Sequence, residues 1–164
     1  MNKFLKTLIV SAGNTLMRDD GLGFAALQRL QQVIVNENIQ FFDSGTDIFK
    51  LMTIQEEYEK IIILDAIQSG NEPGTIYRFH LDQIDSINKN NSLHQIKLTE
   101  ALKLLKVIQN NFAKSEIILY GIEPFDISFG EEISPVIQNS IKYMVDLICA
   151  ELENARSYSC QKYN

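Results

Sequence analysis

The sequence predicts a three-layer, doubly wound α/β fold, with a five-stranded, mostly parallel sheet, one antiparallel strand and helices on both faces. Short apolar runs alternate along the chain with longer segments of helical periodicity. The run KIIILDAI at residues 60–67 is apolar without alternation, which is typical of a parallel strand covered on both faces. One connection between strands is too short to hold a crossover helix. In such a fold the ligand crevice lies at the carboxyl ends of the parallel strands.

The first half of the chain is expected to form three strands and two helices. An apolar run at about residues 5–10 predicts the first strand, and the helix after it has apolar residues at near 3.6-residue spacing. These residues are Leu22, Ala26, Leu30, Val33 and Ile34. A second strand at about 39–42 ends in DSGT, and a helix at about 47–57 leads to the central strand.

The strand after the central one should run antiparallel. The turn cluster SGNEPG separates KIIILDAI from TIYRFHL at residues 75–81, and TIYRFHL has the composition of a strand. A connection this short cannot carry the chain back to the start of a parallel neighbour. We therefore expect this strand, the fourth along the chain, to be the one antiparallel strand of the sheet.

A polar loop at residues 82–97 is expected next, followed by a helix at about 98–110. A strand at 116–122 and a helix at about 135–152 complete the pattern. We expect residues 1–154 to form a single α/β domain and residues 155–164 a flexible C-terminal tail.

Composition narrows the class of protein. The chain has 164 residues, 45% of them hydrophobic, which is enough for one domain with a full core. Its net charge is -6 and its basic residues do not cluster, so we expect no nucleic acid partner. Two cysteines make no disulfide framework, no apolar run reaches membrane-span length, and MNKFLKTLIVSAGN becomes polar too early for a signal peptide. We expect a monomeric cytoplasmic protein with no membrane partner.

The segment GNTLMRDDGLG, residues 13–23, lies between the first strand and the first helix. Its glycines have the wrong spacing for a dinucleotide fingerprint, and two adjacent aspartates would repel a phosphate. Capping of the helix by Asp19 and Asp20 is one interpretation, but it leaves Asn14 unexplained. The other is that one carboxylate binds a metal ion.

Possible metal partners follow in the chain. Asp65 ends the most apolar strand, where a carboxylate is costly unless it is paired, exposed or coordinating, although it could simply cap the next turn. His94 lies in the predicted polar loop, where a histidine is often only solvated surface. Two carboxylates and one imidazole would make an O,O,N site suited to nickel or zinc.

The segment DSGT, residues 43–46, matches the active-site motif of aspartic proteases. There is one copy, so a homodimer would be needed, and the motif lies between a strand and a helix rather than in an all-β domain. The alternative is a turn in which Gly45 takes an unusual φ and Thr46 caps the next helix.

The opening segment resembles the G-N-x-L-x-x-D-[DE]-G-x-G signature of the [NiFe]-hydrogenase maturation endopeptidases. The likeness continues through DSGT, LDAIQSGNEPGTI, LHQIKLTEAL and YGIEP, and it extends over about residues 5–150. Ser11 stands where many members of that family have glycine.

The resemblance implies an endopeptidase that removes the C-terminal extension of a hydrogenase large-subunit precursor after nickel insertion. The family's catalytic and metal-binding positions fall on Asp20, Asp65 and His94, with Asp19 or a backbone group completing the helix start. Nickel carried by the substrate would be recognised there, and zinc or another divalent ion could occupy the same site. A nucleotide-binding module and a non-enzymatic hydrogenase-assembly chaperone of flavodoxin-like fold are the alternatives.

Overall fold

The computed structural model describes residues 6–86 and 93–154, and of residues 84–86 and 93–96 it describes the backbone alone. The strands are β1 (Thr7–Ser11), β2 (Ile39–Asp43), β3 (Lys60–Ala66), β4 (Ile76–His80) and β5 (Glu116–Ile122). They form one sheet in the order β2-β1-β3-β5-β4, and β4 alone is antiparallel to its neighbour. The predicted fold class is confirmed.

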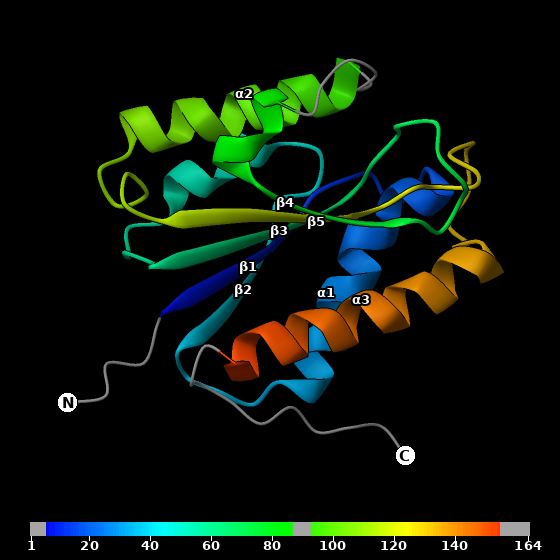
Figure 1. The fold of residues 1–164 in the computed structure, drawn as a ribbon, viewed down its shortest axis with the longest axis horizontal. Helices are drawn as coiled ribbons and strands as arrows, with labels where there is room; N and C mark the ends of the chain where they lie inside the picture. The colour runs from blue at the N-terminus through cyan, green and yellow to red at the C-terminus, as the bar shows by residue number, and fades with distance from the viewer. Residues whose placement is uncertain (1–5, 87–92, 155–164) are drawn as a thin grey trace.

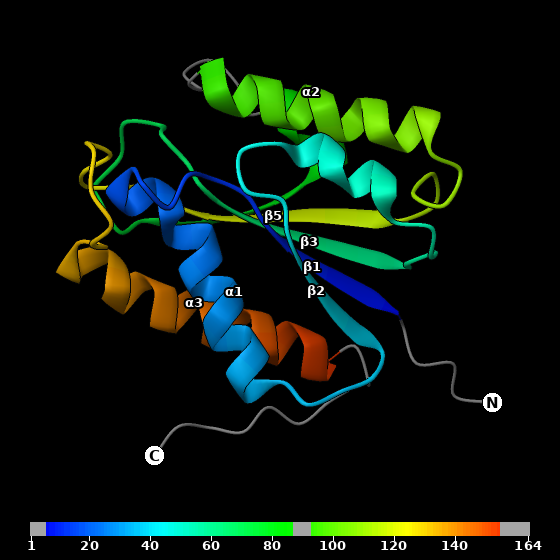
Figure 2. The ribbon, with the colours of Figure 1, turned by 180° about the vertical axis from the view of Figure 1, so that it is seen from behind.

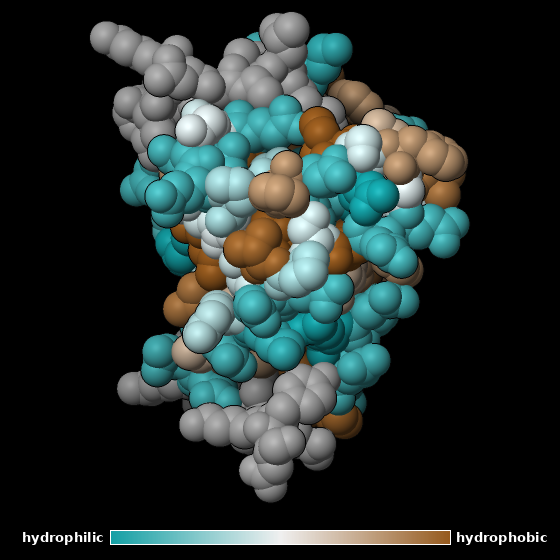
Figure 3. Space-filling model, turned by 90° about the vertical axis from the view of Figure 1, so that its right-hand side faces the viewer, coloured by the Kyte–Doolittle hydropathy of each residue, from teal (hydrophilic) through white to brown (hydrophobic). Residues whose placement is uncertain are grey.

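Helices cover both faces of this sheet (Figures 1 and 2). Helices α1 (Leu22–Val33) and α3 (Pro135–Asn154) lie side by side on one face. Helix α2 (Leu93–Ile108) and the short 3-10 helix η2 (Ile48–Thr53) cover the other. The carboxyl ends of the parallel strands point to the right in Figure 1, and Figure 3 shows that side of the molecule face-on. None of the helices in the described part of the chain has the length and apolarity needed to cross a membrane.

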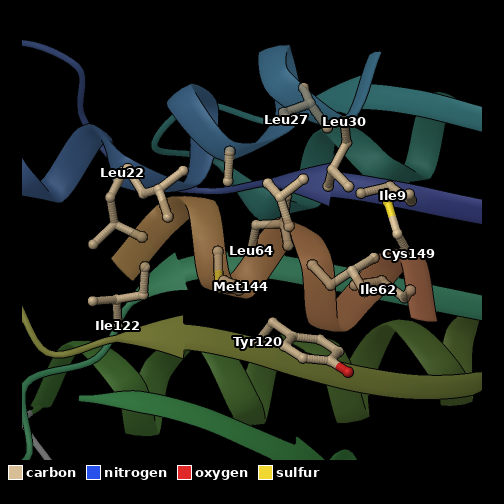
Figure 4. Close-up of a cluster of buried hydrophobic side chains, with 14 of the residues drawn as sticks. Ile9, Leu22, Leu27, Leu30, Ile62, Leu64, Tyr120, Ile122, Met144 and Cys149 are labelled. Carbon is tan, nitrogen blue, oxygen red and sulfur yellow. The ribbon is translucent and has the colours of Figure 1, made fainter. Parts of the chain in front are cut away.

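Each face of the sheet has its own apolar core. The side chains of alternate β3 residues point to opposite faces, so that Ile62 and Leu64 pack with α1 and α3 while Ile61 and Ile63 pack with α2 and η2. Figure 4 shows the first of these clusters, which includes Met144 and Cys149 of α3. The apolar residues expected on one side of α1 are all buried: Leu22, Ala26, Leu30, Val33 and Ile34.

The strand β4 runs antiparallel as predicted, but β3 is not its partner. Its residues Ile76–His80 pair with Ile118–Ile122 of β5, which is inserted between β3 and β4. The chain therefore leaves β3, crosses the position that β5 later fills, and returns along the edge of the sheet. A short connection indicates direction but does not identify the neighbouring strand.

Two expectations about helices are wrong. The segment at 47–57 is not a full helix: η2 ends at Thr53, and Ile54 is extended. The Thr53 hydroxyl donates to the Lys50 carbonyl, 2.8 Å away, and Asp47, not Thr46, caps the N-terminus through the Phe49 N–H. These local bonds favour a short turn over a continued helix.

The other error concerns the polar loop at 82–97. Leu81–Ser86 form a 3-10 helix, η3, and α2 begins at Leu93 rather than near Leu98. Leu93 and Ile96 extend the helical spacing of apolar residues toward the N-terminus, and this segment has neither glycine nor proline. Residues 87–92 lie outside the described residues, as does the predicted tail at 155–164.

Candidate active site

The turn after β1 needs glycine at position 13. Gly13 has φ +120°, which favours glycine, and its N–H donates to the Gly45 carbonyl 2.9 Å away. A Cβ at this position would lie 2.0 Å from the backbone oxygen of Asp20 and 3.5 Å from Oδ1 of Asp65. The main chain at Gly13 thus fills the space beside both acidic residues.

Asp20 lies in the 3-10 helix η1 (Arg18–Gly21), directly before α1. Its Oδ2 accepts a hydrogen bond of 2.9 Å from the Asn14 N–H. The Asn14 side chain in turn accepts a bond of 3.0 Å from the Leu16 N–H, which closes the turn. Asn14 therefore holds the turn that aims the Asp20 carboxylate, and this role explains a residue that helix capping did not.

Two further glycines allow close packing around the start of α1, Gly23 against the sheet and Gly21 against the turn after β1. A Cβ on Gly23 would lie 2.4 Å from the Leu64 carbonyl oxygen and 2.7 Å from that of Ala12, and one on Gly21 would lie 2.9 Å from Thr15 Cα. The N-terminus of α1 thus packs directly on the carboxyl ends of β1 and β3. This contact fixes η1, and with it Asp20, beside the end of β3.

Asp65 is the sixth residue of β3 and is only 1% exposed. Burial, and to a smaller extent the negative charge of Asp20, raise the pKa of its carboxyl from 3.8 to about 8. A hydrogen bond of 2.8 Å from the Ala66 N–H to Oδ1 opposes this shift. Two acidic side chains from different elements therefore lie close enough to repel each other, at the edge of the sheet where ligands bind.

The third residue predicted for the site is His94. Its backbone lies in the first turn of α2, not in a loop, and its side chain is outside the described residues. Among the side chains that the structure describes, no group of three His, Cys, Asp or Glu residues is placed to hold a metal ion. The structure thus brings Asp20 and Asp65 together and leaves His94 as a prediction.

Asp19 has a role that the sequence did not indicate. It is fully buried, and its carboxylate accepts hydrogen bonds from the N–H groups of Phe125 at 3.0 Å, Asp126 at 2.9 Å and Ser134 at 2.7 Å. It does not cap a helix, because neither η1 nor α1 has a side-chain cap. Asp19 or a backbone group was expected to complete the helix start, and the Asp19 alternative is wrong: its side chain holds the loop between β5 and α3.

Glu123, directly after β5, holds the other loop at this edge. Its carboxylate accepts bonds from the N–H groups of Ser69 and Gly70 and from the Tyr77 hydroxyl. Burial would raise the pKa of Glu123, but these hydrogen bonds outweigh it and the pKa is lowered. Glu123 is thus a charged anchor for the segment that follows Asp65.

The DSGT segment forms a turn. Asp43 Oδ1 accepts bonds from the Ser11 hydroxyl at 2.8 Å and the Gly45 N–H at 3.0 Å, and Gly45 has φ +56°. The unusual φ expected of Gly45 is confirmed. Ser11, where the sequence departs from many members of the resembled family, ties β1 to this turn. The turn lies in an α/β fold and not in an all-β domain, so its context gives no support to an aspartic protease.

Comparison with known proteins identifies the family. The HycI family model, described as hydrogenase maturation protease, matches residues 25–151. The chain belongs to the hydrogenase maturation protease family. A putative hydrogenase maturation protease of Methanocaldococcus jannaschii is 30% identical over 84% of this chain and 93% of its own length. The hydrogenase expression/formation protein HupD of Bradyrhizobium diazoefficiens is 28% identical over 90% of this chain and 78% of its own length.

Solved structures of hydrogenase maturation proteases share this fold. The [NiFe] hydrogenase maturation protease HybD of Thermococcus kodakarensis has a TM-score of 0.76 at 30% identity, covering 88% of this chain and 97% of that one. The Escherichia coli maturating endopeptidase HybD has a TM-score of 0.78 at 25% identity, covering 92% of this chain and 94% of that one. This hydrogenase maturation protease is therefore a peptidase, which decides against a nucleotide-binding module and against a purely non-enzymatic chaperone.

Proposed function

We propose that this maturation protease removes the C-terminal extension of a [NiFe]-hydrogenase large-subunit precursor that already holds nickel. We further propose that Asp20, Asp65 and His94 bind that nickel. The observation that carries the proposal is the buried carboxyl of Asp65, whose pKa is raised to about 8 by burial and by the charge of Asp20. A divalent cation beside these two groups would remove the repulsion between them.

The donor atoms suit such a cation. Two carboxylates with an imidazole make an O,O,N set, which nickel binds more strongly than iron or manganese do and which zinc also accepts. Three protein ligands leave coordination positions for groups of the precursor. Nickel held in this way would polarise the scissile carbonyl and orient the bond for attack by water.

The chain's own residues prepare the site. The Asn14 N–H orients the Asp20 carboxylate, and the Ala66 N–H orients Asp65. Without a cation, the raised pKa keeps a proton on Asp65 near neutral pH, and the carboxyl releases that proton when positive charge arrives. Binding of the metal-loaded precursor is therefore coupled to proton release from Asp65.

The test compares one precursor in two forms, loaded with nickel and free of it, each incubated with this protein. Mass spectrometry should show a shortened product from the nickel-loaded form alone. A precursor cut equally well without nickel would rule out the metal part of the proposal. A loaded precursor that binds and stays intact would rule out processing of this substrate. A cytoplasmic location and a monomeric state are also part of the proposal.

A further inference from the structure

We propose that the loop at residues 124–134 is a docking surface for an apolar segment of the precursor, and that Asp19 fixes this surface relative to Asp20. The inference rests on the proposed function, because it names the part of the protease that recognises the same substrate. It adds a surface and a positioning residue to a site that otherwise consists of the proposed nickel ligands.

The loop is attached to the same turn that presents Asp20. The three backbone N–H bonds to the Asp19 carboxylate hold both ends of the loop. The backbone adds three more bonds, from Arg18 N–H to the Gly130 carbonyl at 2.8 Å, from Gly130 N–H to the Leu16 carbonyl at 2.9 Å and from Asp19 N–H to the Asp126 carbonyl at 3.0 Å. The position of the loop is thus set by the residues next to Asp20 in the chain.

The side chains on this loop are apolar and face solvent. Phe129 is 79% exposed and Phe125 is 67% exposed, while Ile127 between them is also exposed. Leu16, whose backbone pairs with Gly130, is exposed as well. Figure 3 shows apolar side chains among polar ones on the side of the molecule toward which the parallel strands point. A fixed loop that displays aromatic side chains is typical of a protein-binding surface, where such groups supply most of the binding energy.

The charges around the loop indicate that the apolar segment of the precursor also has positive charge. Glu131 and Glu132 follow the loop's apolar residues and are both exposed. The guanidinium of Arg18 forms an ion pair with Asp126 at 3.5 Å, so it offsets a carboxylate of the loop itself. With the partly exposed Asp20 nearby, the surface favours a partner segment that has positive charge beside its apolar residues.

The surface is also continuous with the candidate site. Hydrogen bonds of Asp19 and Gly130 join the loop to η1, and η1 contacts β3, which is the strand that carries Asp65. A precursor held on this loop would have its adjoining chain beside the two acidic residues. Binding on the loop therefore contributes to the affinity of the protease for the precursor.

The test compares each loop variant with a control variant at a residue that is equally exposed elsewhere on the surface. Phe129→Ser is compared with Val107→Ser on α2, because both residues are 79% exposed, and Phe125→Ser with Tyr143→Ser on α3, where the exposures are 67% and 68%. KM and kcat are measured for cleavage of the nickel-loaded precursor, together with direct binding of that precursor to each variant. The loop variants should raise KM and the dissociation constant at least about tenfold and leave kcat within about twofold. The control variants should match the wild type.

A loop variant with the KM of its matched control would overturn the docking surface. Failure of the wild-type protein to cut the precursor would instead overturn the proposed function, so the two outcomes are distinct. The double variant Glu131→Gln/Glu132→Gln tests the charge: its KM should rise at low salt and match the wild type at high salt. A wild-type KM in low salt would exclude a positively charged partner segment.

Discussion

Asp19 and Asp20 are neighbours in the chain, yet their carboxylates serve different parts of the molecule. Asp19 is fully buried and accepts hydrogen bonds from Phe125, Asp126 and Ser134 of the β5–α3 loop. Asp20 is partly exposed, accepts a bond from Asn14, and acts electrostatically on Asp65. Asp19 therefore has a structural role, whereas we propose that Asp20 binds the metal ion.

Asp19→Asn should reduce stability, because the amide keeps one acceptor oxygen and turns an N–H donor toward backbone donors. Loss of charge-assisted bonds and burial of unsatisfied groups should lower the free energy of unfolding by about 3 kcal/mol. Chemical denaturation measures this change. Asp20→Asn is the control, with an expected change below about 1 kcal/mol. Equal losses in the two variants would contradict the different roles of the two carboxylates.

Gly13→Ala should disturb both the fold and the site. The new Cβ would meet the Asp20 backbone oxygen at 2.0 Å, in a conformation with φ +120°. We expect a loss of more than about 2 kcal/mol in stability and a displaced Asp20. Gly70→Ala is a matched control, since Gly70 also has a positive φ, +84°, but nothing lies within 4 Å of its added Cβ. A Gly13 variant no less stable than the Gly70 variant would contradict the close packing.

Asp65→Asn should abolish processing and leave stability nearly unchanged. Asparagine keeps the shape of the side chain and an oxygen that can accept the Ala66 N–H, but it cannot become charged. Precursor conversion should therefore stop, while the thermal melt shifts by only a few degrees. Conversion at the wild-type rate would show that Asp65 is not part of the nickel site and would favour a role in capping the turn after β3.

Glu151 should stabilise the protein against acid. Burial opposes ionisation of this residue, but bonds from Arg78, Tyr120 and Lys60 outweigh it and lower its pKa to about 2. Because its pKa is lower in the folded than in the unfolded protein, its contribution is full above pH 4.5 and is lost as the pH falls toward 2. Glu151→Gln should reduce stability at pH 7 by at most about 3 kcal/mol and have a smaller effect near pH 2. An equal loss of stability at pH 7 and near pH 2 would contradict the lowered pKa of Glu151.

Much of the fold could be predicted because it depends on periodic patterns. The apolar face of α1 and the unbroken run of β3 report burial directly, so α1, β3 and the layer order follow from the residues. The partner of β4 could not be predicted, since β5 is formed some 40 residues later in the chain and inserts between β3 and β4. Local hydrogen bonds of Asp47 and Thr53 determined that η2 is short, and a periodic pattern does not report such bonds.

The candidate site could be predicted only in part. The neighbouring positions of Asp20 and Asp65 follow from the ends of β1 and β3, which are adjacent in the sheet. The roles of Asp19 and Glu123 could not be seen, because Asp19 binds residues more than 100 positions away and Glu123 binds residues more than 40 positions away. Such contacts exist only once the loops at the edge of the sheet are in place.

The most direct test of the account measures the mass of a nickel-loaded large-subunit precursor after incubation with the wild-type protein and with His94→Ala. The wild type should convert the precursor to a single shortened product. His94→Ala should leave it intact, with thermal stability within about 0.5 kcal/mol of the wild type if the side chain has no structural role. Conversion by His94→Ala at the wild-type rate would contradict the three-residue nickel site.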